Sequence, residues 1–352
     1  MPRSGSSIHL LVPGLFGPMP ALEQSAEICS VPGLETLLAR SDCSAWPGRD
    51  LETTLLSFCA LDRVQGRDYP IAALRRVGDG GSPDRSFWLQ ANPVHLRADR
   101  DRLLLFGSED LALSQREAEQ LALLVENHFV AQGWRIEVVL PHRWYLTLDK
   151  IPAISTHSLD DVLGRNIDQF LPAGDDSLHW HGLINEIQML LYSDEVNRKR
   201  DEQGQLSVNG IWFSGGGCLP ESSIGLPFDQ VFANESLARG LALTAVITPH
   251  AFPGSSGSLR KMAGGSLVVY DELRPAVLRV DPGGWRDALI ALDNWLDDLI
   301  QGVRQKQPGE LLLYPCNGEV YRLRRSALRR FWRRPKQLGG YLNNQSQLGP
   351  VS

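Results

Sequence analysis

Continuous apolar runs alternate with amphipathic stretches along most of the chain. The runs typical of buried strands lie at 8–14, 210–213, 265–271 and 309–315. Stretches with apolar side chains at helical spacing lie at 33–41, 50–62, 180–204, 234–245 and 282–305. Apolar strands that alternate with helices are typical of parallel sheets buried on both faces. The pattern therefore predicts an α/β fold with a mostly parallel sheet and helices on both faces.

The last of these helices has a well-defined apolar face. Between 282 and 305 apolar side chains recur three or four positions apart, which places them on one side of a helix. They are Trp285, Leu289, Leu292, Trp295, Leu296 and Leu299. We expect this face to form part of the core.

A different pattern begins after the turn-rich stretch 78–86. Its predicted strands are a pair within 86–97, followed by 134–140 and 143–149. It also contains a predicted helix, in which Ser114 and Glu117 fit a capping box and Gly133 follows the end. We expect these elements to form a compact α+β unit.

The change of pattern also predicts the domain organisation. Residues 1–80 and 160–336 are expected to form one discontinuous core, with the α+β unit at 85–150 inserted into it. Residues 337–352 are expected to form a flexible tail.

Composition adds little to this picture. The 352 residues are 43% hydrophobic and 22% charged, as in ordinary globular proteins. The net charge of −6 argues against nucleic-acid binding by the total field of the protein. Five cysteines without a CxxC pair argue against a disulfide framework and favour a reducing cytoplasm. No signal segment and no membrane span is expected, so we predict a cytoplasmic protein.

The stretch "VNGIWFSGGGCLP", residues 208–220, ends an apolar run in three consecutive glycines, Gly215, Gly216 and Gly217. A glycine run after a strand can bind a phosphate through backbone N–H groups. It can also be a tight turn where two backbone segments approach closely. No Lys-Ser or Lys-Thr follows as in a P-loop, which favours the structural interpretation.

Longer motifs resemble a known family. The stretch "DEVNRKRDEQGQLSVNGIWFSGGGCLP" (194–220) resembles archaeal-type, cofactor-independent phosphoglycerate mutases, as do 87–96, 142–148 and 235–245 in the same order. The motifs "PGLFGP", "RWYL", "WFSGGG" and "LRRFWRRPK" are similar to those of bacterial RpfE-type regulatory proteins. The resemblance implies an alkaline-phosphatase-like fold. In the mutases, chemistry needs two divalent metals held by Asp and His, and a Ser nucleophile.

The positions that match this catalytic centre carry other residues. The nucleophile position is Arg49, and the ligand positions are Pro13, Ser236, Arg274 and Pro315. Asp271 keeps a carboxylate, but no His follows His250. The resemblance therefore implies a catalytically degenerate scaffold with no catalytic residue, metal or cofactor, acting as a regulatory, interaction or small-anion-binding protein. The alternative is a metal-dependent mutase or phosphatase with a rearranged site.

Several residues remain candidates for binding a small anion. They are Arg49, Arg143, Asn209, Trp212, Gly215, Gly216, Gly217 and Asp271. Arg143 matches a phosphate-facing Arg in the mutases, but Gln90 stands where the resemblance expects the second Arg of that clamp. A guanidinium suits phosphate or carboxylate because its donors form a planar fork.

The segment after residue 320 is strongly basic. It contains Arg324, Arg325, Arg329, Arg330, Arg333 and Arg334, together with Arg322 and Lys336. Phe331 and Trp332 lie among these cations. We interpret the segment as a solvated helix that Ser326 caps and Pro335 ends. The alternative is a surface for nucleic acid or a membrane. A protein partner or small anion is the favoured ligand class; nucleic acid is not favoured.

Overall fold

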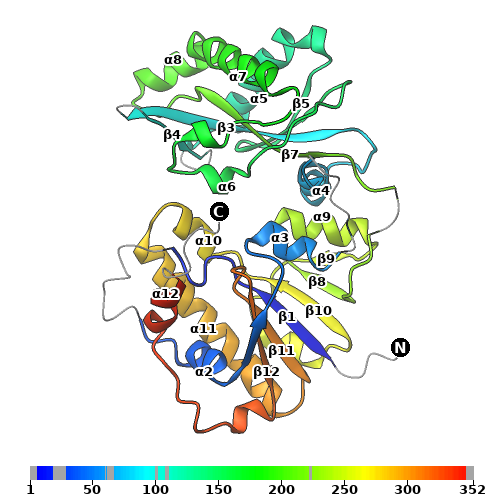
Figure 1. Ribbon diagram of the computed structural model, residues 1–352, viewed down its shortest axis with the longest axis vertical. Helices are drawn as coiled ribbons and strands as arrows, with labels where there is room; N and C mark the ends of the chain where they lie inside the picture. The colour runs from blue at the N-terminus through cyan, green and yellow to red at the C-terminus, as the bar shows by residue number, and fades with distance from the viewer. Residues whose placement is uncertain are drawn as a thin grey trace. The chain divides into compact units, whose positions relative to one another are not determined.

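The computed structural model describes residues 6–18, 29–59, 61, 67–99, 102–107, 111–221 and 224–345. The chain divides into two compact units (Figure 1). Unit 1 consists of Met1–Leu61 and Ile224–Ser352, and unit 2 of Asp62–Ser223.

Unit 1 contains a seven-stranded sheet in the order β2-β12-β11-β1-β10-β8-β9. The strands are β1 (Ser7–Leu11), β2 (Asp42–Ala45), β8 (Gln230–Phe232), β9 (Pro249–His250), β10 (Gly265–Val269), β11 (Glu310–Tyr314) and β12 (Glu319–Arg324). Central β1 pairs in parallel with β10 and β11, and β8 continues the parallel order to β9. Only the pairs β11–β12 and β12–β2 are antiparallel among the described strands of unit 1.

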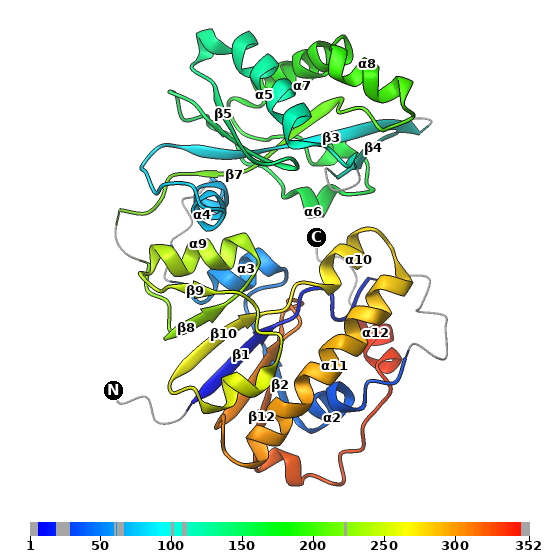
Figure 2. The ribbon, with the colours of Figure 1, turned by 180° about the vertical axis from the view of Figure 1, so that it is seen from behind.

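The helices of unit 1 pack against this sheet or against one another. They are α2 (Pro32–Arg40), α3 (Leu51–Leu56), α9 (Ser236–Thr244), α10 (Leu273–Leu278), α11 (Pro282–Arg304) and α12 (Gly339–Gln345). Two short 3-10 turns, η4 (Ser256–Lys261) and η5 (Ala327–Arg329), join them. Figure 2 shows α2 and α11 lying against the sheet.

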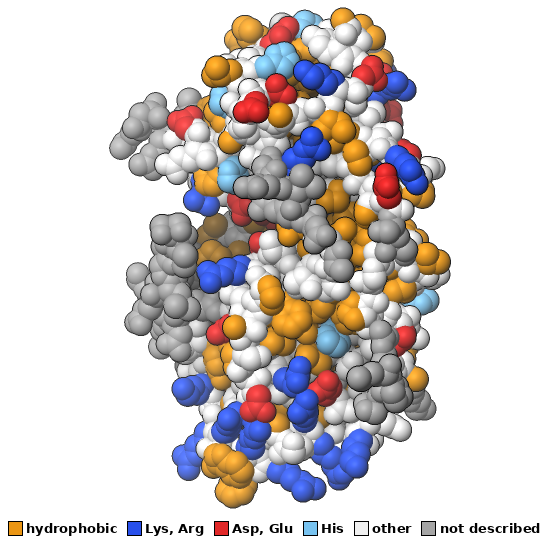
Figure 3. Space-filling view, turned by 45° about the vertical axis from the view of Figure 1, so that its right-hand side comes forward, with side chains coloured by type: hydrophobic (Ala, Val, Ile, Leu, Met, Phe, Trp, Pro, Cys, Tyr) orange, Lys and Arg blue, Asp and Glu red, His pale blue; other side chains and the backbone are white. Residues whose placement is uncertain are grey.

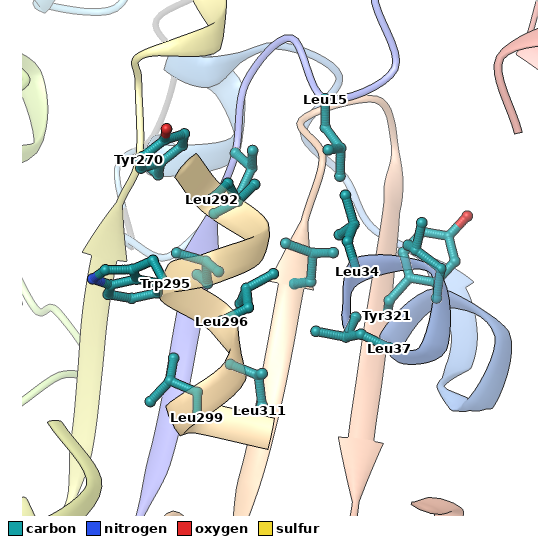
Figure 4. Close-up of a cluster of buried hydrophobic side chains, with 14 of the residues drawn as sticks. Leu15, Leu34, Leu37, Tyr270, Leu292, Trp295, Leu296, Leu299, Leu311 and Tyr321 are labelled. Atoms are coloured by element: carbon teal, nitrogen blue, oxygen red, sulfur yellow. The ribbon is translucent and has the colours of Figure 1, made fainter. Parts of the chain in front are cut away.

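The core of unit 1 follows the predicted face of α11. The six apolar side chains of that face are all buried, and Leu292, Trp295, Leu296 and Leu299 point at the sheet and at α2 (Figure 4). In β1, Ile8 and Leu10 join this core, whereas the intervening His9 contacts rings from the other face. Burial of each such Leu stabilises the fold by about 2 kcal/mol. The packing of α11 on the sheet therefore fixes where β1, β10 and β11 end.

Unit 2 contains a five-stranded antiparallel sheet. Its strands are β3 (Trp88–Asp99), β4 (Arg102–Phe106), β5 (Arg135–Leu140), β6 (Arg143–Thr147) and β7 (Gly210–Gly217). The order is β4-β3-β6-β5, and β7 pairs with β3. Its helices are α4 (Ile71–Gly78), α5 (Gln115–His128), α6 (Leu159–Val162), α7 (Ser177–Tyr192) and α8 (Glu195–Glu202), with 3-10 turns η2 (Val130–Gln132) and η3 (Ile167–Gln169).

The predicted α/β fold class is confirmed: unit 1 has a mostly parallel sheet with helices packed against it. The capping box of Ser114 and Glu117 at the start of α5 is also confirmed. The 86–97 stretch differs, because it forms the single long strand β3 instead of a pair. Its two halves pair with different neighbours, β6 and β4, so a break in the pattern did not mean a break in the strand.

The bounds of the second unit differ from the predicted 85–150. Unit 2 begins near residue 62 and extends to 223, so it includes α7, α8 and β7. Ile187 and Leu191 of α7 pack in one cluster with Leu121 and Val125 of α5. The prediction that 210–213 belongs to the parallel sheet is wrong, because β7 pairs antiparallel with β3. An apolar run indicates burial but not which sheet buries it.

Two other predicted segments, the helix at 50–62 and the flexible tail at 337–352, differ from the structure. Helix α3 ends at Leu56, well short of residue 62. The predicted flexible tail contains α12 up to Gln345, where Leu338 and Leu342 are buried; residues 346–352 lie outside the described part.

The basic segment is not the predicted helix. It consists of the end of β12, the 3-10 turn η5 and a stretch without helix or strand at 330–336. Ser326 makes no side-chain capping bond, and the backbone after it forms a single 3-10 turn instead of a helix.

Among the described residues, the longest apolar helical stretches fall short of what is needed to traverse a bilayer.

Candidate functional site

Three parallel strands of unit 1 end at the same edge of the sheet. Beyond β1 and β11 the pairing continues, because Val12 N donates to Tyr314 O at 2.9 Å. Tyr270 N likewise donates to Leu11 O at 2.9 Å. The residues that follow, Pro13, Asp271 and Pro315, therefore lie side by side at this carboxyl edge, which is where open α/β sheets bind ligands.

Arg49 reaches the same edge from the turn before α3. Asp50 is the N-cap of this helix and accepts a bond from Thr53 N at 2.7 Å. Gly48 packs so tightly on α3 that an added Cβ would lie 2.3 Å from Thr54 Cα. The Arg49 side chain lies over Gly318, since a Cβ added there would be 3.5 Å from Arg49 Cγ. Arg49 is exposed, and within the described chain no carboxylate forms an ion pair with it.

Ser236 reaches the edge as the first residue of α9. It is buried, and the preceding Glu235 caps the helix by accepting a bond from Ala238 N at 2.8 Å. Glu235 is near enough to Asp271 to raise its pKa. The structure thus brings Pro13, Arg49, Ser236, Asp271 and Pro315, from five separate segments, to one edge of the sheet.

Burial at this edge raises the pKa values of one carboxyl group and one thiol. Burial, followed by the charge of Glu235, raises the pKa of Asp271 to about 6, and the cation Arg274 opposes the shift. Burial also raises the pKa of the Cys316 thiol to about 12. A thiol with such a pKa is protonated at neutral pH and is a poor nucleophile. Cys316 adopts φ 62, a left-handed conformation in the turn after β11.

The residues present do not fit the pair of divalent metals that the resemblance implies. Such a site needs several carboxylates or imidazoles with free lone pairs. At this edge Asp50 and Glu235 already accept bonds from the first turns of α3 and α9. Among the residues that the structure describes, no group of three or more His, Cys, Asp or Glu side chains is placed to hold a metal ion.

The glycine run lies in unit 2 and is covered by α4. Gly215 has φ 65, and a Cβ there would be 2.8 Å from Ile71 Cβ. At Gly217 it would be 2.7 Å from Pro70 Cα. The Gly215 N–H donates to Thr156 Oγ1 at 3.0 Å. The glycines therefore let the start of α4 approach β7, and this supports the structural interpretation of the run.

Asn209 and Trp212 are also occupied by internal contacts of unit 2. Asn209 lies just before β7, accepts a bond from the Leu96 N–H at 2.6 Å and donates to the Leu96 carbonyl at 2.8 Å. Trp212 is buried and donates from Nε1 to His157 O at 2.9 Å. Both side chains thus have structural partners.

Arg143 is held by a buried acid. Its Nη1 donates to Asp79 Oδ1 at 2.6 Å, and the Tyr145 hydroxyl donates to Asp79 Oδ2 at 2.5 Å. The Asp79 side chain is 8% exposed. Burial and the Asp79 charge hold the pKa of Tyr145 well above its usual value, so the tyrosine stays a donor. Gln90 is buried.

The basic segment divides into anchored and exposed cations. Arg324 pairs with Glu310 at 3.0 Å, and Arg330 and Arg333 pair with Asp42. Arg325, Arg329 and Arg334 are exposed. These last three form no ion pair with the described carboxylates.

The sequence analysis missed Glu235 and noted Arg274 only as a replacement for a metal ligand. Glu235 stands immediately before a predicted helix, at the N-cap position, which was a usable signal. Its proximity to Asp271 depends on the crossing from β8 to α9 and could not be read from the sequence.

Comparison with known proteins agrees with the fold. No family model matches the chain. A 2,3-bisphosphoglycerate-independent phosphoglycerate mutase from Methanosarcina acetivorans is 28% identical over 106 residues. This match covers 28% of the chain and 26% of the mutase, so the chain spans about a quarter of that relative's length.

Two solved structures are similar over most of the chain. The PH0037 protein from Pyrococcus horikoshii aligns with a TM-score of 0.54 and 12% identity, covering 92% of this chain and 87% of that one. A cofactor-independent phosphoglycerate mutase from Thermoplasma acidophilum aligns with a TM-score of 0.47 and 14% identity, covering 98% and 99%. The chain is thus similar in sequence to archaeal 2,3-bisphosphoglycerate-independent phosphoglycerate mutases over about a quarter of its length, and similar in fold to the PH0037 protein.

Proposed function

We propose that this chain is a catalytically degenerate, mutase-like protein that binds a small anion at the carboxyl edge of unit 1 and acts in regulation. The observation that carries the proposal is Arg49. It is exposed at the edge of the sheet, at the position where the resemblance places the nucleophile. A guanidinium there can bind phosphate or carboxylate but cannot form a phosphoenzyme.

The neighbouring groups support binding more than turnover. Ser236 is buried, and the high pKa of Cys316 keeps that thiol protonated. Asp50 and Glu235 serve as helix caps. None of these four groups is placed as an activated nucleophile or as a free metal ligand. The RpfE-type motifs "PGLFGP" and "LRRFWRRPK" favour a regulatory role.

The alternative is a metal-dependent mutase or phosphatase with a rearranged site. Its support is the sequence similarity to mutases, together with Asp271 and Glu235 at the same edge. In that case the two acids would hold a cation. Anion binding requires Arg49 and no metal, whereas the metal-dependent reaction requires an added divalent metal.

A thermal-shift experiment tests anion binding. Wild type is heated with inorganic phosphate, 3-phosphoglycerate or short carboxylic acids, beside Arg49→Ala and the control Arg304→Ala. Arg304 is an exposed cation at the end of α11. At about 100 times Kd, a ligand stabilises the folded state by about 2.7 kcal/mol. We expect Tm to rise for wild type and Arg304→Ala only; an equal rise in Arg49→Ala would place the anion elsewhere.

A coupled mutase assay tests the alternative. Phosphoglycerate interconversion is measured with Mn²⁺, Mg²⁺ or EDTA, and the metal content of the purified protein is determined by elemental analysis. We expect no turnover above background. Turnover that EDTA abolishes and Asp271→Asn removes would establish the metal-dependent enzyme instead.

A further inference from the structure

The turn after β12 is held firmly against unit 1. Ala327 and Leu328 are buried, and Arg40 Nη1 donates to Leu328 O at 2.7 Å. Arg330 binds both carboxylate oxygens of Asp42, at 2.5 and 3.0 Å. Arg333 Nη1 donates to Ser41 O at 2.8 Å. These bonds fix the backbone on both sides of residues 331 and 332.

This fixed turn presents two aromatic side chains to solvent. Phe331 is 81% exposed and Trp332 is 66% exposed. Their ring centroids lie 5.2 Å apart with the planes at 82°. Neither ring belongs to a hydrophobic cluster of the described residues. Neighbouring aromatic side chains exposed within a polar rim are typical of a binding surface, because apolar surface is unfavourable in water.

Cations surround the two rings. The segment from 322 to 336 contains eight Lys and Arg residues and no acid, in a chain whose net charge is −6. Arg325, Arg329, Arg334 and Lys336 are exposed and form no ion pair with any described carboxylate. Figure 3 shows Lys and Arg side chains gathered around hydrophobic ones at the end of unit 1 where the chain loops after β12.

We propose that this turn docks unit 1 on an anionic lipid bilayer. Phe331 and Trp332 enter the interface between headgroups and acyl chains, where aromatic rings are favoured. Arg325, Arg329 and Arg334 bind lipid phosphates and carboxylates at the surface. The negative charge of the lipid headgroups complements the positive charge of residues 322–336. Phe331 and Trp332 add an apolar contact that the cations alone cannot make.

The geometry favours a bilayer over nucleic acid. Single strands bind by stacking successive bases on aromatic faces along a groove. Here the two rings are nearly perpendicular, so one strand cannot stack neighbouring bases on both faces. A bilayer imposes no such requirement, because it accepts rings in any orientation at its interface.

Vesicle sedimentation tests the proposal. The full chain is mixed with vesicles of phosphatidylcholine alone or with 30% phosphatidylserine. We expect binding only to the anionic vesicles, and loss of binding at 500 mM NaCl because salt screens the attraction. Phe331→Ser with Trp332→Ser should weaken binding by roughly 10-fold. Arg325→Gln with Arg329→Gln should weaken it by on the order of 10-fold.

Two control variants test whether binding depends on the turn after β12 or on exposed apolar side chains and cations in general. Leu178 and Tyr192 of α7 are 84% and 86% exposed, so Leu178→Ser with Tyr192→Ser removes comparable exposed apolar area. Arg304→Gln with Lys306→Gln removes two exposed cations elsewhere in unit 1. Both controls should bind as wild type does. Equal binding to neutral vesicles, or unchanged binding by the turn variants, overturns the proposal. Tighter binding of a 20-nucleotide single strand, lost in the same turn variants, assigns the surface to nucleic acid instead.

Discussion

The glycine run of unit 2 and the carboxyl edge of unit 1 both resemble parts of a phosphate site, but their surroundings differ. Around the run, Gly215 N bonds Thr156 and α4 fills the space above the glycines. At the edge, Arg49 is exposed and Asp271 has a raised pKa. In the first region the protein itself occupies the space beside the glycines and bonds their N–H group. In the second region Arg49 is exposed and forms no ion pair with a described carboxylate.

The difference shows how to separate a packing motif from a binding motif. In unit 2 the candidate groups Asn209, Trp212 and Arg143 each have a protein partner. Groups that are satisfied internally contribute to stability. Groups at an open strand edge can instead contribute to binding. The following mutations test that contrast in order of expected effect.

Gly215→Ala should cost the most stability. Ala at φ 65 is strained, and its Cβ would clash with Ile71 at 2.8 Å, so we expect a loss of about 3 kcal/mol in the free energy of unfolding. Gly204→Ala is the matched control, since Gly204 has φ 70 with nothing within 4 Å; it should cost about 1 kcal/mol. Urea unfolding measures both. If the two variants lost similar free energy of unfolding, the close approach of Ile71 to Gly215 would not be the reason for the glycine run.

Asp79→Asn should destabilise unit 2 by about 2–3 kcal/mol. The change leaves the half-buried Arg143 without its counter-charge. Asp149→Asn is the control, because Asp149 and Arg135 are 78% and 76% exposed at 3.9 Å, and such surface pairs contribute about 0–1 kcal/mol. If the two variants lose equal stability, Arg143 is not held by the pair and is available for a ligand.

Asp271→Asn should stabilise the protein above pH 6. The folded pKa of about 6 lies above the usual 3.8, so the folded state binds more protons between those values and wild-type stability falls as pH rises through this window. The amide removes that penalty. We expect a gain of about 1–2 kcal/mol at pH 7.5 and almost none at pH 4.

The same measurement distinguishes the two proposed functions. If Asp271 holds a cation, the amide variant will be less stable than wild type at pH 7.5. Asp287→Asn on the exposed face of α11 should show no such pH dependence.

Arg49→Ala should have the smallest effect on stability. An exposed side chain without an ion pair contributes within about 0.5 kcal/mol. A loss above about 2 kcal/mol would mean that Arg49 is a structural plug that packs at the carboxyl edge of the sheet. Thermal unfolding without added anions decides between the plug and the binding role, and Arg304→Ala supplies the baseline.

The local pattern of apolar and polar residues was sufficient to predict the main helices and strands of the core of unit 1. It was also sufficient to predict that residues after the parallel strands lie at one edge of the sheet. The capping box at Ser114, the buried face of α11 and the apolar strands β1, β10 and β11 were all predictable. Helical caps and periodic burial depend on residues within one or two turns, so the sequence contains them directly. That the residues after these strands share one edge follows from their parallel order.

The amino-acid sequence by itself therefore determined the α/β fold class of unit 1, the buried face of α11 and the capping box of α5. Only the tertiary structure decided that β7 pairs with β3, that α4 covers the glycine run, and that Arg143 pairs with Asp79 across 64 residues. It also decided that the arginines of the basic segment divide into anchored and exposed sets. The physical reason is that strand pairing and charge pairing join residues far apart in the chain, whose proximity no local pattern encodes.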